Sequence, residues 1–67
     1  MSKTLQPHQQ RVVDEKSELD GKIERLAKFI KGTVYPTTDL DEQDRLARQL
    51  RAMYGYSEIL GERIKNF

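Results

Sequence analysis

Residues 46–67, LARQLRAMYGYSEILGERIKNF, form the stretch of sequence that decides the fold. Apolar side chains recur here at alternating steps of four and three residues, with one serine among them: Leu46, Leu50, Met53, Ser57, Leu60, Ile64 and Phe67. Because an α-helix turns once in 3.6 residues, these steps keep the whole series on one side of a helix. The stretch predicts a long amphipathic helix with an almost continuous apolar seam.

A second and weaker seam precedes it in the chain. Leucine and valine recur every seven residues at Leu5, Val12, Leu19 and Leu26, and a companion row contains Gln9, Lys16, Ile23 and Ile30. Pro7 suits the first turn of a helix, where a missing N–H costs nothing. Gly32 follows the last seam residue, and we expect it to end the helix in the left-handed conformation. The predicted helix covers about residues 7–31, with Gln9 and Lys16 as polar interruptions of its seam.

The only clear linker covers residues 32–38, GTVYPTT. Pro36 disfavours helical geometry at Tyr35, the residue before it. Thr38 or Asp39 can then cap a second helix over about residues 39–66. Two long helices joined by so short a connection favour an antiparallel pair. We therefore predict an all-α fold in which residues 1–67 form a single helical-hairpin domain.

Several apolar residues lie outside the two seams and widen the apolar stripes: Val13, Ala27, Phe29, Ala47, Tyr54, Tyr56 and Ile59. A two-helix hairpin uses one stripe per helix, so a widened stripe favours contact with a further surface. The chain is short and has no cysteine, which leaves oligomerisation as the common remedy for a small core. We expect a homo-oligomeric helical bundle. The alternative is that these side chains only lean over the edge of the hairpin.

Composition argues against several classes of function. Twelve basic and eleven acidic residues nearly cancel, whereas DNA-binding proteins usually carry a basic excess. No apolar stretch approaches the length of a membrane span, so we expect a soluble, intracellular protein with no membrane partner. His8 is the only histidine, and the carboxylates alternate with lysine and arginine as in solvated helix faces. We expect no metal, no cofactor and no catalytic residues.

The candidate ligand-binding cluster is Arg51-Ala-Met-Tyr54-Gly-Tyr56. Tyrosine rings can stack on a nucleobase, and arginine can bind a phosphate through two N–H groups. The predicted ligand contacts are three tyrosines and four cationic or histidine side chains: Tyr54, Tyr56, Tyr35, Arg51, Arg11, Lys28 and His8. The alternative is that all three rings pack at helix edges or at an interface.

Two segments carry a resemblance to known proteins. Residues 10–30, QRVVDEKSELDGKIERLAKFI, and residues 49–64, QLRAMYGYSEILGERI, resemble the two helices of a family of short phage and prophage proteins that includes crAss-like phage members. A weaker similarity, carried by Pro7-His8 at a helix start, a variable linker and an apolar second helix, is to phage cyclic-nucleotide sponges that counter CBASS defence.

This resemblance implies a function without catalysis. Such sponges are oligomers of helical hairpins that hold a nucleotide messenger between chains and do not degrade it. The expected function is an anti-defence protein that sequesters a cyclic oligonucleotide or an ADP-ribose-type signal. The alternative is a protein–protein adaptor that docks on a host protein and inhibits it.

Overall fold

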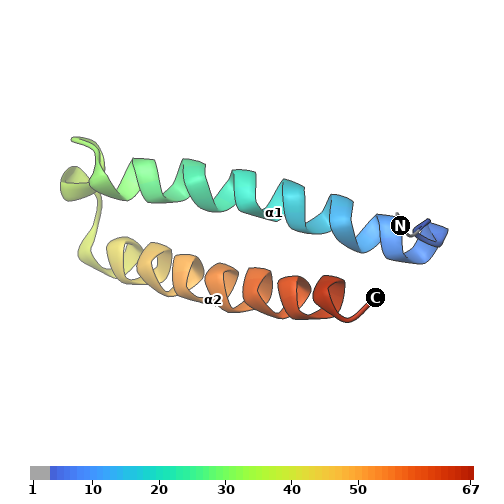
Figure 1. The fold of residues 1–67 in the computed structure, drawn as a ribbon. Helices are drawn as coiled ribbons and strands as arrows, with labels where there is room; N and C mark the ends of the chain where they lie inside the picture. The colour runs from blue at the N-terminus through green and yellow to red at the C-terminus, as the bar shows by residue number, and fades with distance from the viewer. Residues whose placement is uncertain (1–3) are drawn as a thin grey trace.

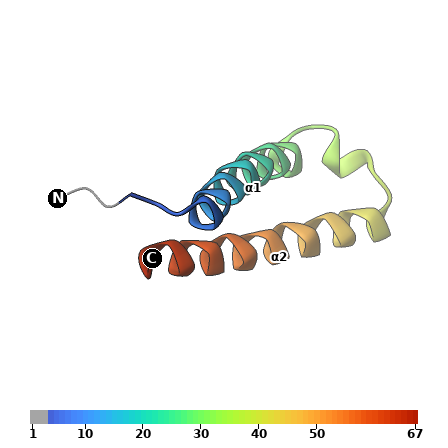
Figure 2. The same ribbon diagram turned by 90° about the vertical axis from the view of Figure 1, so that its right-hand side faces the viewer.

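Two long antiparallel helices make up almost the whole molecule. The computed structural model describes residues 4–67, with α1 at Pro7–Lys31, a short 3₁₀ helix η1 at Tyr35–Thr37 and α2 at Leu40–Lys65. The helices lie side by side in a rod whose principal extents are 51 × 16 × 16 Å, with η1 at the closed end (Figures 1 and 2). The prediction of an all-α antiparallel hairpin is confirmed. Its assembly into a homo-oligomer stays a prediction.

The start of α1 is fixed by its own side chains. Pro7 is the first helical residue, and the backbone N–H of Gln6 donates a 2.8 Å hydrogen bond to Oε1 of Gln9. Such a bond from the residue three positions into the helix satisfies a donor that the helix itself cannot reach. Gln9, a polar interruption of the predicted seam, therefore serves as a cap.

The end of α1 differs from the prediction at Gly32. Its φ of −84° and ψ of −175° are extended, and no described residue has a positive φ. The prediction of a left-handed glycine here was wrong. Instead, the Gly32 N–H donates to the carbonyl of Phe29 at 3.1 Å, so the last turn tightens and the chain continues directly into the linker.

The linker is held by hydroxyl groups. Thr37 and Thr38 each donate from Oγ1 to a carbonyl three residues earlier, at 2.6 and 2.7 Å, which stabilises η1. The Tyr35 hydroxyl donates to the carbonyl of Gln43 at 3.0 Å, and its ring meets Phe29 edge-on with centroids 6.4 Å apart. One side chain thus connects the end of α1 to the start of α2, where Asp39 accepts from the N–H of Asp41 as the N-cap.

The core lies between the two helices and is strongest toward the termini. Val12, Leu19 and Ile23 of α1 are buried with Leu60 of α2, whose side chain is only 1% exposed. Partly buried apolar residues pack around them: Leu50, Met53, Ile64 and Phe67. Each fully buried side chain of this kind contributes about 1.5–3 kcal/mol, so these contacts hold the hairpin closed.

Candidate ligand-binding groove

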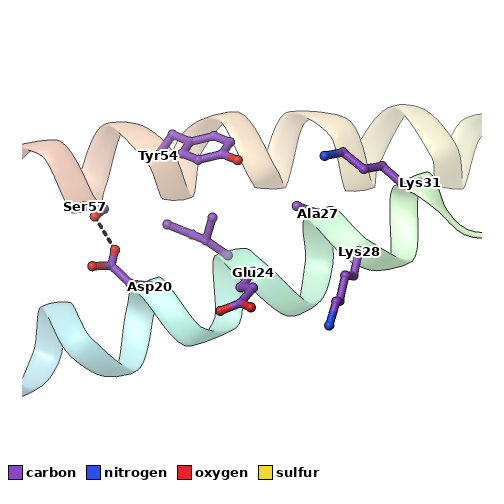
Figure 3. A pocket seen from close by; sticks show the side chains of 8 residues that line it. Asp20, Glu24, Ala27, Lys28, Lys31, Tyr54 and Ser57 are labelled. Carbon is purple, nitrogen blue, oxygen red and sulfur yellow. Dashed lines mark hydrogen bonds between the residues drawn. The ribbon is translucent and has the colours of Figure 1, made fainter.

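A groove of about 480 Å³ runs between α1 and α2 on one side of the hairpin. It spans the middle of the molecule and the half next to the linker. Its lining comes from six residues of α1 and two of α2: Asp20, Ile23, Glu24, Ala27, Lys28, Lys31, Tyr54 and Ser57. Figure 3 shows Tyr54 on one wall and Ala27 on the other, with its methyl group turned toward α2. The groove is therefore an open feature of the interhelical surface.

Small and flat side chains account for the groove. Ile23 is buried and forms part of the lining, and Ala27 fills little of the space above the seam. The Tyr54 side chain is 53% exposed, so a large part of its ring remains accessible to a ligand. An apolar base beside an accessible aromatic ring suits a planar ligand.

Charged residues of opposite sign occupy different parts of the α1 side. Asp20 and Glu24 lie toward the middle of the helix, and Lys28 and Lys31 lie in its last turn next to the linker. Cations are favoured at a helix C-terminus by the helix dipole. Within residues 4–67, Glu24, Lys28 and Lys31 form no ion pair, so their charges are available to a ligand or partner.

One polar network closes the groove toward the termini. Lys16 Nζ donates to Asp20 Oδ2 at 2.7 Å and to Ser57 Oγ at 3.1 Å, and Ser57 Oγ donates to Asp20 Oδ1 at 2.5 Å (Figure 3 shows the Ser57–Asp20 bond). The hydrogen bond from Lys16, followed by that from Ser57, holds the pKa of Asp20 below its ordinary value of 3.8. Asp20 is therefore ionised at neutral pH and already has two partners.

The same network accounts for the presence of a lysine in the seam of α1. The helices are not frayed at Lys16, because its ammonium bridges a carboxylate on its own helix and a hydroxyl on the other. A Cβ added at Gly61 would lie 3.3 Å from Lys16 Cε, so the glycine leaves room for the lysine stem. The charged end of Lys16 is bound within the hairpin.

The network does not resemble a catalytic one. The Ser57 side chain is buried, and its hydroxyl donates to an ionised carboxylate while it accepts from an ammonium group. A serine nucleophile needs an accessible oxygen and a neighbouring base that can take its proton. The described part of the chain also contains no group of three metal-ligating side chains.

The structure brings two of the seven predicted ligand contacts to the groove, Tyr54 and Lys28. Tyr56, 44% exposed, lies two positions along α2 and so points to another side of that helix. The Tyr35 hydroxyl is bonded to Gln43 and its ring packs on Phe29. The remaining three are exposed and do not line the groove: His8, Arg11 and Arg51. As ligand contacts, all seven remain predictions.

Sequence reasoning missed the other lining residues. Asp20, Glu24, Ala27 and Lys31 recur at steps of four, three and four, which is the spacing of one helix side. That row runs beside the seam of α1. The spacing was a usable signal, but the charges were interpreted as an ordinary solvated face.

No described helix is both long and apolar enough to cross a membrane. A protein-family model with the description Sequestin matches residues 6–66. A protein of Enterobacteria phage T4, named as an uncharacterized 7.5 kDa protein in the denB-rIIB intergenic region, is 37% identical over 60 residues, which cover 90% of this chain and 94% of the T4 protein. No solved structure matches the chain. The predicted resemblance to short phage proteins is supported, whereas its extension to crAss-like phages stays a prediction.

Proposed function

Because the chain belongs to the Sequestin family, we propose that it is a phage anti-defence protein that binds a nucleotide immune signal and keeps it from its receptor. The family name supports a sequestering role. A phage relative of nearly the same length supports a role during infection. In this proposal the protein acts in the host cytoplasm, where such signals are made, and it releases the ligand chemically unchanged.

The observation that carries this proposal is that an accessible Tyr54 ring, an apolar base and two lysines without ion-pair partners line the same groove. Base stacking on an aromatic side chain contributes about 1–3 kcal/mol and tolerates any base. Lys28 and Lys31 supply ammonium groups for phosphate oxygens at the linker end. A volume of about 480 Å³ lies within the range of small-molecule sites.

The acidic side of the groove bears on the class of ligand. The Glu24 carboxylate has no partner among residues 4–67 and can accept hydrogen bonds from ribose hydroxyls or from an exocyclic amino group. A phosphate placed beside Glu24 would be repelled. The ligand therefore has its phosphates near Lys28 and Lys31 and a sugar or base near Glu24, as a cyclic oligonucleotide or an ADP-ribose-type messenger can.

Calorimetry of the purified protein against cyclic di- and trinucleotides and cyclic ADP-ribose isomers tests the proposal. We expect at least one tight ligand, recovered intact by chromatography after the protein is heat-denatured. A chemically altered ligand would indicate an enzyme. Absence of binding across the whole panel would contradict the proposal.

Matched variants locate the site. Tyr54→Ala removes the ring in the groove, and we expect it to weaken binding by about 1–3 kcal/mol. Tyr56→Ala is the control, because it removes a similarly exposed tyrosine ring from the same helix, outside the groove. In the same way, Lys28→Ala is compared with Arg51→Ala. Equal losses in both members of a pair would place the ligand elsewhere.

A further inference from the structure

An exposed heptad row runs along α2 next to the groove. Its members recur every seven residues: Leu40, Ala47 and Tyr54. Leu40 is 78% exposed, and Ala47 and Tyr54 are also exposed. Tyr54 lines the groove, which places the row on that side of α2. An exposed heptad row is the kind of surface that packs against another helix.

The α1 side of the groove has a matching pattern of charge. Glu24 and Lys31 are also seven residues apart, on either side of Ala27, and neither has an ion-pair partner within the described chain. A helix with an acid at one end of such a segment and a base at the other is complementary to an antiparallel copy of itself. The pattern thus specifies a second copy of this chain better than it specifies an unrelated protein.

A single two-fold axis fits the residue patterns on both helices. The Ser57–Asp20 bond shows which levels of α1 and α2 face each other. Seven residues from that bond toward the linker are Ala27 on α1 and Leu50 on α2. Ala27 lies near the centre of the Glu24–Lys31 segment, and Leu50 lies near the centre of the Ala47–Tyr54 segment. A two-fold axis at this level places Glu24 of one copy opposite Lys31 of the other. It also places Ala47 of one copy opposite Tyr54 of the other.

From this agreement we propose that two copies of the chain pair groove to groove as an antiparallel four-helix bundle. Glu24 of each copy then faces Lys31 of the other. On α2, Ala47 of each copy faces Tyr54 of the other, so that a large side chain meets a small one. Every helix is antiparallel to both of its neighbours, as is common in four-helix bundles. The same surface is used by both copies, which closes the assembly at two.

The pairing concerns the free protein and stands without the proposed function. Pairing and ligand binding share three groove residues, because Glu24, Lys31 and Tyr54 all face the second copy in the pairing. A nucleotide that contacts these residues therefore displaces the second copy.

Analytical ultracentrifugation of the ligand-free protein in the micromolar range tests the pairing. The wild-type chain of 7.9 kDa should sediment at twice that mass. Glu24→Lys places lysine against lysine at two symmetric positions, and Lys31→Glu places two glutamates together. Each variant should raise the dimer dissociation constant about tenfold or more. Glu18→Lys, on the same helix but outside the groove, is the control and should leave the dimer unchanged.

Exchanging the two charges tests the pairing even if one of the single variants folds poorly. The double variant Glu24→Lys with Lys31→Glu restores opposite charges and should dimerise. An equimolar mixture of the two single variants should form heterodimers for the same reason. Circular dichroism checks that each variant remains helical. A wild-type monomer, a dimer that neither single variant weakens, or a failure of both the double variant and the mixture to dimerise would overturn the proposal.

Discussion

The half of the hairpin near the termini and the half near the linker are built on the same heptad spacing but differ in how fully they are closed. Near the termini, Val12, Leu19 and Leu60 are buried and Lys16 bridges the helices. Near the linker, Ala27 leaves space above the seam, and Tyr54 and Leu40 are exposed. The comparison teaches that the periodicity sets where the helices meet, while the size of the flanking side chains sets whether a groove remains.

Leu60→Ala, in the half near the termini, should reduce the free energy of unfolding more than any other substitution proposed here. Its side chain is 1% exposed at the centre of the core, and such truncations cost about 2–5 kcal/mol. Leu50→Ala, in the half that carries the groove, removes a partly buried side chain and should cost roughly 1–2 kcal/mol. Urea unfolding at one fixed protein concentration measures both. Equal losses would mean that the two halves are equally well packed.

Ser57→Ala tests the polar network at the boundary between the halves. It removes the hydroxyl that donates to Asp20 and accepts from Lys16. Because both of these partners are partly exposed and stay bonded to each other, the loss should cost about 0.5–1.5 kcal/mol. Ser17→Ala is the control, since Ser17 is exposed on α1 and alanine is the better helix former. A Ser57→Ala protein as stable as wild type would show that the network contributes nothing.

Two glycines of α2 differ in the space around them. A Cβ at Gly55 would meet nothing within 4 Å, so Gly55→Ala should stabilise the helix by about 0.5–1 kcal/mol. At Gly61 the new Cβ would lie 3.3 Å from Lys16 Cε, so Gly61→Ala should gain less or lose stability. Thermal unfolding by circular dichroism ranks the two variants. A larger gain at Gly61 would contradict the close packing around Lys16.

The smallest effect we predict is one of pH. Because the pKa of Asp20 is lowered by Lys16 and Ser57, its contribution to stability is present above the unfolded-state value of 3.8 and is lost as the pH falls through the lower folded-state value. Asp20→Asn should therefore reduce the loss of stability below about pH 4. Glu58→Gln is the control at an exposed position. Identical pH profiles for wild type and Asp20→Asn would contradict this role.

Much of the fold was predictable, because a seam with steps of four and three permits one helical interpretation. The conformation of Gly32 was not, because an extended glycine whose N–H bonds to the Phe29 carbonyl ends a helix as well as a left-handed glycine does. The groove was predictable only in part: helix spacing gives the sides of each helix but leaves open which level of α1 faces which level of α2. Two of the three polar interruptions, Lys16 and Ser57, bond to each other across the seam. Matching the polar residue of one seam with that of the other would have predicted which level of α1 faces which level of α2.

The central claim is that the open half of the hairpin binds the ligand, and an NMR titration with the tightest nucleotide tests it most directly. The backbone amide signals of Ala27, Lys28 and Tyr54 should shift most, and those of Tyr56 and Ile59, on other sides of α2, should stay nearly in place. The largest shifts at Tyr56 and Ile59, or at His8 and Arg11 near the N-terminus, would contradict the account.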